Sequence, residues 1–263
     1  MAEVKRINND EFVDILSNLK FDKLKLAKDY FVTLLLYLIK DVEGIYFKGG
    51  TALHKIILDH AGLSEDLDFT LSRNVLEVKK EITRVVDESN LFEGITQDKN
   101  VEGFLRMAVH YKDFEGTSDA IFIDLNQRGK LVTETENHEI KHFYLPFIPK
   151  FSVKTVGKKE IIAEKMAAAI GMNKPRDHFD VYMILKEGLP IDLTLVRVKC
   201  EQSGHEFSII KMFNQAKKLK NRWDKDMVAL LSEPITYQEV IKTLAKYFKL
   251  KEEKVSKEET LDT

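Results

Sequence analysis

The first forty residues carry apolar side chains at helical spacing. Asn9 and Asp10 can cap a helix over residues 11–16, and a longer helix is expected over residues 21–40. The apolar run inside this longer segment lies between charged residues and is shorter than the roughly 20 residues that span a bilayer. The pattern therefore predicts two helices that cover a core, the second of them largely buried.

Apolar and polar residues alternate with period two further along the chain. Residues 45–48 are a short apolar stretch before a glycine pair, and the alternation itself occupies residues 66–71 and 104–112. Such alternation is typical of strands with one buried face. Residues 120–126 are β-branched and aromatic around one acid, which also favours a strand. Residues 75–89 return to helical spacing between two of these strands. Helices that alternate with strands in this way predict a small mixed sheet flanked by helices.

The second half of the chain is expected to be helical. We place a domain boundary near residue 155, so that residues 1–155 form an α/β domain and residues 156–250 a helical bundle. Residues 251–263 have little hydrophobic content, which predicts a disordered tail. The fold class is therefore α+β. The helices are expected over residues 159–170 with Gly171 as a stop, from Pro175 onward, and over residues 193–202, 207–219 and 237–250.

A glycine turn and an acidic strand stand close together in the sequence. Gly49 and Gly50 allow a backbone with positive φ, and Thr51 would start a helix whose free N–H groups attract phosphate. Asp66 and Asp68 lie two residues apart on a strand, so both carboxylates share one face. Carboxylates placed in this way can hold a hard cation such as Mg²⁺. A lone Asp-x-Asp is often a solvated strand face, and a lone glycine pair is usually only a turn. Together, in the order strand, glycine turn, helix and acidic strand, the two motifs are far more specific than either one alone.

Further candidates lie on the third strand and in the helical half. Asp124 can converge with the two aspartates if its strand lies beside theirs, although a plain acid at a sheet edge is an equally good interpretation. Lys165 can hold triphosphate oxygens, against the commoner case of a solvent-facing lysine. Asp177 and Asp180 share a helix face, and Asp180 can position Lys165 or accept a proton from an incoming hydroxyl.

Composition and charge narrow the class of protein. The formal net charge of −2 argues against a protein around which nucleic acid wraps. Lysine-dense stretches at residues 154–159 and 217–222 can still form a local basic surface, although a solvated helix face is the commoner case. The single cysteine, Cys200, excludes an internal disulfide and a cysteine-rich zinc site. No signal-peptide core follows the N-terminus, so a cytoplasmic protein without a membrane partner is the default expectation.

The chain resembles a known family over about residues 46–185. Residues 48–53 read Lys-Gly-Gly-Thr-Ala-Leu, residues 64–68 read Ser-Glu-Asp-Leu-Asp, and Glu-Lys and Arg-Asp-x-x-Asp motifs follow at residues 164–165 and 176–180. These motifs are similar to those of the AbiEii/AbiGii nucleotidyltransferase-like toxins of prokaryotic toxin–antitoxin systems, within the DNA polymerase β-like nucleotidyltransferase superfamily. Two positions depart from the usual pattern: Thr51 replaces a serine, and Leu63 stands where an arginine is usual.

The resemblance implies a function and a set of site residues. Asp66 and Asp68 would bind Mg²⁺ or Mn²⁺, joined by Asp124 if the strand pattern brings it to them; Lys165 would contact phosphate, and Asp180 would be a further essential acid. The residues implied to hold the nucleoside triphosphate (NTP) are Lys48, Gly49, Gly50, Thr51 and Ser64. Family members with an assigned activity add nucleotides to the 3′ end of tRNA, which stops translation until an antitoxin intervenes. The resemblance thus implies an NTP-dependent nucleotidyltransferase toxin with RNA and an antitoxin as partners.

Two other functions compete with this one. The chain can be a catalytically silent module that uses the same scaffold to bind RNA or an antitoxin, although the presence of both Asp66 and Asp68 argues for an active enzyme. It can also be an enzyme that transfers the nucleotide to a protein hydroxyl. Metal-dependent binding of an NTP separates the first alternative from an enzyme, and the mass of a modified partner separates the second.

Overall fold

The structure is a computed structural model that describes residues 4, 5 and 7–249. The chain divides into two compact units, which are described separately. The α/β unit comprises Met1–Ile161 and Ala229–Ser232, and the helical unit comprises Ile162–Val228 and Glu233–Thr263. The boundary expected from the sequence was near residue 155. The tail predicted over residues 251–263, and Leu250 at the end of the last predicted helix, lie outside the described residues.

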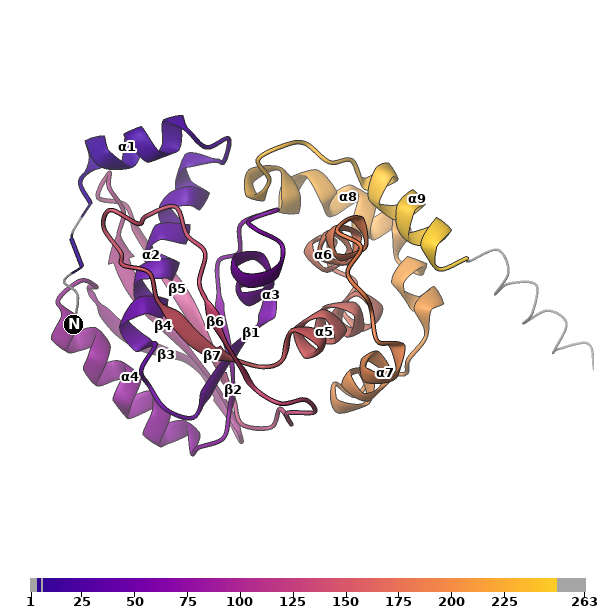
Figure 1. Cartoon of the computed structure of the whole chain (residues 1–263), viewed down its shortest axis with the longest axis horizontal. Coiled ribbons are helices and arrows are strands. Elements are labelled where there is room, and N and C mark those ends of the chain that lie inside the picture. The colour runs from indigo at the N-terminus through magenta and orange to yellow at the C-terminus, as the bar shows by residue number, and fades with distance from the viewer. Residues whose placement is uncertain (1–3, 6, 250–263) are drawn as a thin grey trace, which may run out of the picture. The chain divides into compact units, whose positions relative to one another are not determined.

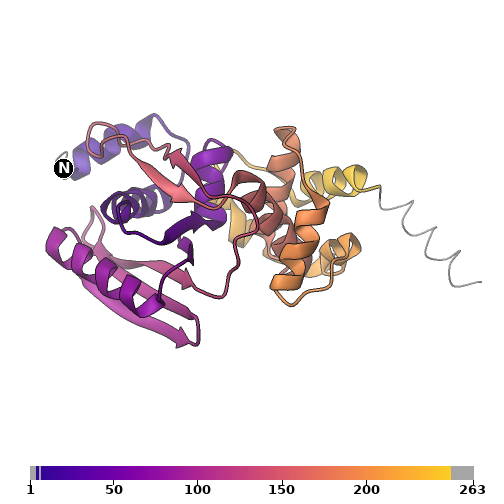
Figure 2. The ribbon, with the colours of Figure 1, turned by 60° about the horizontal axis from the view of Figure 1, so that its bottom comes forward.

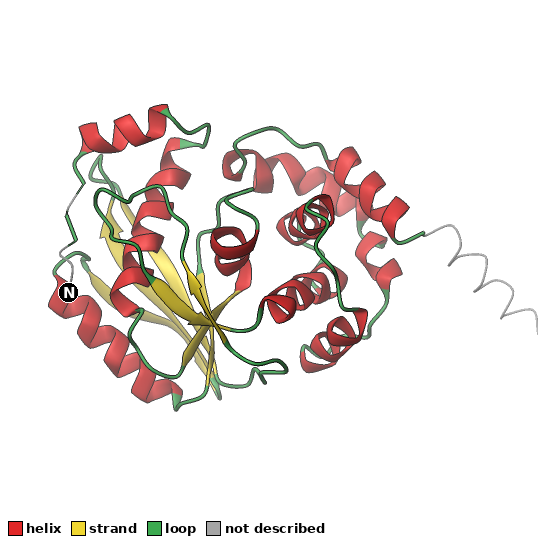
Figure 3. Ribbon diagram, viewed as in Figure 1, coloured by secondary structure: helices red, strands yellow, loops and turns green. Residues whose placement is uncertain are grey.

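A mixed seven-stranded sheet forms the centre of the α/β unit, with the strand order β3-β4-β5-β2-β1-β7-β6 (Figures 1 and 3). The pairs β2–β5 and β1–β7 are parallel, and the other neighbours are antiparallel. The expected small mixed sheet is therefore confirmed. The strands are β1 (Ile45–Lys48), β2 (Leu67–Leu71), β3 (Gly94–Val101), β4 (Phe104–Lys112), β5 (Ser118–Asn126), β6 (Glu136–Glu139) and β7 (Ser152–Thr155).

Helices cover one face of this sheet. The largely buried α2 (Lys23–Ile39) packs against α4 (Val75–Ser89) (Figures 1 and 2). Phe31 of α2 stacks on Tyr111 of β4 with ring centroids 4.2 Å apart. The short α1 (Asn9–Ser17) packs on α2 and buries Phe12. Every second side chain of the central strands points into this core, because side chains alternate between the two faces of a strand. These buried side chains are Leu67, Phe69, Leu71, Leu105, Met107, Val109, Tyr111, Ile121, Ile123 and Leu125.

The opposite face of the central strands is more polar. It carries the intervening residues of β2, β4 and β5, among them Asp68, Arg106 and Asp124, all of intermediate burial. Directly after β1 the chain enters the short helix α3 (Gly49–Ala52), which continues into a turn of π-helix, η1 (Leu53–Ile57). The helix expected after the glycine pair is therefore present, and it begins at the first glycine.

Among the described residues, the helical unit contains helices and loops only (Figure 3). The helix α5 starts in the α/β unit and ends at Gly171, and α6 begins at Pro175, both as the sequence predicts. The elements are α5 (Lys158–Gly171), α6 (Pro175–Lys186), α7 (Leu193–Gln202), η2 (Ile209–Phe213), α8 (Ala216–Met227), η3 (Val228–Leu230) and α9 (Tyr237–Tyr247). None of the helices within the described ranges is long and apolar enough to cross a membrane.

The single helix predicted over residues 207–219 is wrong. That segment forms the 3₁₀ turn η2 and then the first part of α8, which runs on to Met227. The buried side chains of α8 are Leu219, Trp223 and Met227, spaced by four residues. This stripe defines the buried face of one helix and explains why α8 extends beyond the predicted end.

Candidate active site

The glycine turn lies at the end of β1. Gly49 has φ +77°, in the left-handed region that favours glycine. A Cβ atom built on it would lie 2.8 Å from Cγ of Asp68, closer than side chains tolerate. Lys48, the last residue of β1, pairs with Asp68 across the antiparallel β1–β2 ladder. The turn is therefore in direct contact with the acidic strand.

A hydrogen bond ties the start of the helix to that strand. The hydroxyl of the buried Thr51 donates to the main-chain carbonyl of Asp66, with an O···O distance of 2.5 Å. Asp66 immediately precedes β2, and Asp68 lies within it, so both carboxylates fall on the polar side of the strand with intermediate burial. In the described part of the chain, no side-chain hydrogen bond from the N-cap residue Lys48 caps the N-terminus of α3. Ser64 lies in the loop just before this motif.

Asp124 lies beside Asp68 but is held by an arginine. The parallel β2–β5 ladder pairs Asp68 with Asp124, and the β4–β5 ladder pairs Asp124 with Arg106. Arg106 donates two hydrogen bonds to the Asp124 carboxylate, Nε to Oδ1 at 2.6 Å and Nη2 to Oδ2 at 2.7 Å. The hydrogen bond and the charge of Asp124 raise the pKa of the Arg106 guanidinium further above its ordinary value, and Asp66 contributes to the same shift. Asp124 is therefore one half of a bidentate ion pair.

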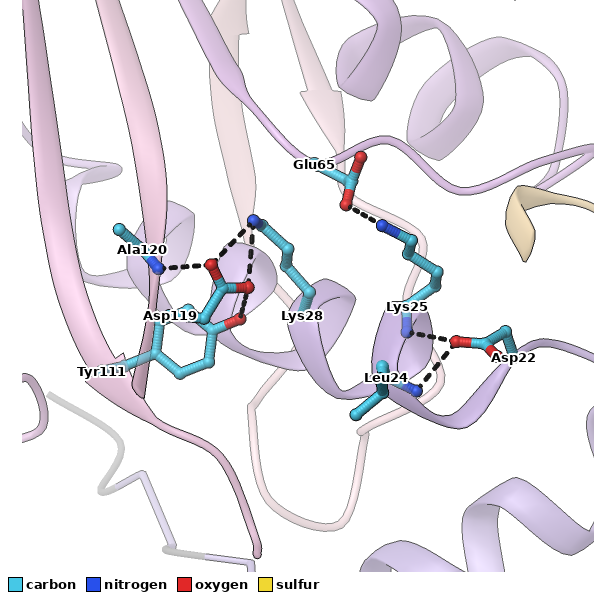
Figure 4. A network of polar contacts seen from close by, with 8 residues as sticks. All are labelled: Asp22, Leu24, Lys25, Lys28, Glu65, Tyr111, Asp119 and Ala120. Carbon is cyan, nitrogen blue, oxygen red and sulfur yellow. Dashed lines mark hydrogen bonds and ion pairs between the residues drawn. The ribbon is translucent and has the colours of Figure 1, made fainter. Parts of the chain in front are cut away.

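Glu65, the remaining acid of this motif, points to α2. Its carboxylate accepts a hydrogen bond from Lys25 Nζ at 2.6 Å, and the same helix is fixed at its N-terminus by Asp22 (Figure 4). Further along α2, Lys28 pairs with Asp119 of β5 at 3.1 Å (Figure 4). Glu65 and Asp119 therefore connect the acidic loop and the sheet to α2.

A buried charge pair lies behind the glycine turn. Lys55, in the π-helical turn η1, is 1% exposed, and its ammonium lies 2.7 Å from Asp29 of α2. Lys55 also donates to the Thr33 hydroxyl at 3.0 Å, and the Tyr144 hydroxyl donates to Asp29 at 3.1 Å. Every partner in this cluster is buried, so the helix that follows the glycine turn is fixed to the core by charge-assisted hydrogen bonds.

The helical unit holds a second charged cluster. Lys165 of α5 lies 2.8 Å from Asp180 and 3.2 Å from Asp177, both on α6. Burial alone would lower the pKa of the Lys165 ammonium, but the charges of Asp180 and then Asp177 outweigh it and raise this pKa above its ordinary value. The two aspartates share one face of α6, as their spacing predicts. Glu164 instead pairs with Lys199 of α7 at 3.1 Å.

The residues singled out in the sequence thus fall into two groups. The α/β unit brings Lys48, Gly49, Gly50, Thr51, Asp66, Asp68 and Asp124 to neighbouring positions on β1, β2, β5 and the turn. The helical unit brings Lys165, Asp177 and Asp180 together. Within the described ranges, no group of three or more His, Cys, Asp and Glu side chains is arranged to hold a metal ion. Mg²⁺ commonly takes one or two carboxylates together with water and phosphate oxygens, and the oxygen donors of Asp66 and Asp68 fit that preference.

Sequence reasoning missed Arg106 and Lys55. For Arg106 a signal was present, because it alternates with Leu105 and Met107 and so shares the polar face with Asp124 once β4 and β5 pair. For Lys55 the signal was weak. A lysine inside an apolar helical stretch is usually solvated, and its partner Asp29 lies in a helix far away in the sequence.

The chain matches one family model and is similar in fold to solved structures. The family model described as "Nucleotidyl transferase AbiEii toxin, Type IV TA system" matches residues 36–248. The crystal structure of JHP933 from Helicobacter pylori is similar with a TM-score of 0.57 and 17% identity, covering 91% of this chain and 97% of that one. MenT4, the nucleotidyltransferase toxin Rv2826c from Mycobacterium tuberculosis H37Rv, is similar with a TM-score of 0.53 and 21% identity, covering 81% of this chain and 69% of that one. At these identities both structures show the fold. No curated protein matches the chain.

Proposed function

The chain belongs to the AbiEii family of nucleotidyl transferase toxins of type IV toxin–antitoxin systems, and we propose that it transfers a nucleoside monophosphate from an NTP to an acceptor hydroxyl with a divalent metal held by Asp66 and Asp68. The observation that carries this proposal is the direct connection between the glycine turn and the acidic strand. Thr51 bonds to the main chain of Asp66, and Gly49 packs on Asp68. A polyphosphate at the turn would therefore lie next to both carboxylates.

The residues of the chain have separate roles in this proposal. Asp66 and Asp68 would hold Mg²⁺ or Mn²⁺, which when bound supplies charge neutralisation for the phosphates. The N–H groups at the start of α3 would orient the phosphate chain, with Lys48 and Ser64 at its margins. Gly49 leaves space for close approach, and the Thr51 hydroxyl keeps the two segments in register. The assignment of Asp124 as a third ligand stays a prediction.

Lys165 and Asp180 are proposed to belong to the same chemistry. Their contact in the helical unit fixes the ammonium between two carboxylates, so Asp180 is suited to position Lys165. The raised pKa of Lys165 keeps the group cationic at neutral pH, as binding a phosphate requires. Their roles as a phosphate contact and a further essential acid rest on the family resemblance, and Lys165→Met tests the first of them through the KM for NTP.

The acceptor is proposed to be RNA, with the 3′ end of tRNA as the first candidate. The support is the resemblance to family members with that activity, together with the type IV toxin–antitoxin family match, which also implies an antitoxin partner. A hydroxyl on a protein is the competing acceptor, and a silent binding module is the competing function. The labelling experiment below tests for an RNA acceptor, and metal-dependent binding of an NTP separates the two competing hypotheses from each other.

The test is transfer of radiolabel. The protein is incubated with total RNA, Mg²⁺ and each α-labelled NTP in turn, and the products are separated on a gel that resolves both RNA and protein. We expect label on RNA with the wild type and none with Asp66→Asn or Asp68→Asn. Asp98→Asn is the matched control, because it removes the same charge from the exposed strand β3. Transfer that survives in both site variants would contradict the assignment of Asp66 and Asp68 as metal ligands. Label on protein would indicate that the acceptor is a protein hydroxyl.

A further inference from the structure

Four charged residues form a row across neighbouring strands of the sheet. Lys48 of β1 pairs with Asp68 of β2, which pairs with Asp124 of β5, which pairs with Arg106 of β4. Directly paired residues on adjacent strands share a face. The row therefore begins at the glycine turn, crosses the metal-binding candidates, and ends at an arginine on the side away from that turn.

Two neighbouring side chains hold Arg106, at one end of the row, in place. Arg106 uses Nε and Nη2 to bind both oxygens of Asp124, and its guanidinium lies 5.3 Å from the centroid of the Phe122 ring. Its side chain is still 36% exposed, and within the described part of the chain Nη1 makes no hydrogen bond. A planar guanidinium fixed by a carboxylate and an aromatic ring, with donors left over, is preorganised to bind an anion.

The balance of charge indicates that Asp124 is the counterion of Arg106. Asp66 and Asp68 together match the charge of one divalent cation, and Mg²⁺ commonly takes no more than two carboxylates alongside phosphate oxygens. Asp124 is already neutralised by a bidentate partner at 2.6 and 2.7 Å. Freeing it for a metal would leave the half-buried Arg106 without its counterion.

The direction of the row indicates which of the two substrates lies near Arg106. In phosphoryl and nucleotidyl transfer the attacking and leaving oxygens lie roughly in line on opposite sides of the phosphorus. If the leaving pyrophosphate is held at the glycine turn, the attacking hydroxyl approaches from the other side of Asp68. That side is where β5 and β4 place Asp124 and Arg106.

We propose that Asp124 holds Arg106 in place and does not ligate the metal, and that Arg106 binds a phosphate of the acceptor, which is therefore a nucleic acid end. This inference rests on the function proposed above, and it selects a phosphate-bearing acceptor over a protein hydroxyl. Arg106 is then an acceptor-binding residue, and Asp124 is its positioning residue.

The first test is metal binding without catalysis, measured by Mn²⁺ electron paramagnetic resonance. We expect Asp68→Asn to weaken Mn²⁺ binding about tenfold or more, while Asp124→Asn changes it by no more than about twofold. Equal weakening by both variants would overturn the assignment of Asp124 and leave the proposed metal site intact. If Asp68→Asn also binds Mn²⁺ normally, the proposed function itself fails.

The second test is the binding of a fluorescein-labelled single-stranded RNA oligonucleotide with a free 3′ hydroxyl, measured by anisotropy over a range of salt. We expect Arg106→Gln to weaken binding about tenfold and to lower the salt slope by about 0.7, the share of one phosphate contact. Asp124→Asn should weaken RNA binding less than Arg106→Gln does. Arg106→Lys should have an affinity between those of the wild type and Arg106→Gln. Arg84→Gln on the exposed face of α4 is the matched control and should bind as the wild type does.

Kinetics separate a binding role from a merely structural one. Arg106→Gln should raise the KM for the RNA acceptor and leave the KM for NTP within about twofold. A raised KM for NTP alone would place Arg106 with the nucleotide and overturn the proposal. The proposal also fails if the wild-type protein does not bind the oligonucleotide, and label transfer to a protein would then still support the proposed chemistry.

Discussion

The hydroxyl of Thr51 donates a 2.5 Å hydrogen bond to the main-chain carbonyl of Asp66. Thr51 belongs to the helix after β1, and Asp66 to the residues that lead into β2, so one side chain joins the two segments of the candidate site. Because Thr51 is 1% exposed, water cannot easily replace this bond. The phosphate-binding turn and the acidic strand are therefore held as one structural element.

Thr51→Val tests this connection. The substitution keeps the size of the side chain and removes the donor, so the Asp66 carbonyl loses this hydrogen bond. We expect the free energy of unfolding to fall by about 1–3 kcal/mol and nucleotidyl transfer to fall with it. Thr51→Ser keeps the hydroxyl and should retain most of both. Urea denaturation and label transfer measure the two effects, and an inactive Thr51→Ser with an active Thr51→Val would contradict this role.

Gly49→Ala should damage the site more than an ordinary glycine substitution. Gly49 has φ +77°, and its added Cβ would press on the Asp68 carboxylate, with Cγ at 2.8 Å. Gly116→Ala is the matched control, because Gly116 has φ +84° with open space around it. Both variants should lose about 1 kcal/mol from the positive φ. Only Gly49→Ala should also lose Mn²⁺ binding, and equal Mn²⁺ affinity in the two variants would disprove the close-contact argument.

Local patterns predicted the elements with strong periodicity. The bounds of β1, β4, α4 and α7 agree with those expected, because their apolar residues follow one clear period and turn or capping residues adjoin them. The glycine turn and the acidic strand were found for the same reason, since each is a short continuous motif. Asp177 and Asp180 were placed on one helix face by spacing alone.

Elements that depend on distant partners were not predicted. Most of the β3 strand is exposed and polar, and β6 (Glu-Asn-His-Glu) and β7 (Ser-Val-Lys-Thr) contain a single aliphatic residue between them, so none of the three shows a strong apolar pattern of its own. Strand pairing, which only the folded chain supplies, creates them. The same holds for the pairs Arg106–Asp124 and Lys55–Asp29, each of which joins two separate elements.

Lys55→Met should destabilise the protein strongly. The substitution removes the ammonium 2.7 Å from Asp29 and leaves that carboxylate buried at 2% exposure, with Tyr144 as its remaining side-chain donor among the described residues. Breaking a buried pair by removing one partner typically costs about 3–5 kcal/mol. The double variant Lys55→Met/Asp29→Leu removes both charges and should recover part of this loss. Chemical denaturation measures all three proteins, and a double variant less stable than Lys55→Met would contradict the explanation.

Two histidines close to Lys55 are kept neutral by the fold. Burial, and after it the charge of Lys55, lower the pKa of His60 to about 4 and that of His142 to about 4. An imidazole in the unfolded chain titrates near 6.5. Between these values the unfolded state binds more protons than the folded state. The contribution of each histidine to stability is therefore fully present above pH 6.5 and is lost as the pH falls toward 4.

The free energy of unfolding should accordingly fall on acidification between pH 7.5 and pH 5. The expected loss is roughly 2 kcal/mol for each of the two histidines at pH 5, since the folded state resists the protonation that the unfolded state accepts. The double variant His60→Gln/His142→Asn keeps a polar group at each position and removes both titrating rings, so its stability should depend less on pH over this range. Urea denaturation at the two pH values measures the difference, and an unchanged pH dependence in the double variant would show that other groups cause it.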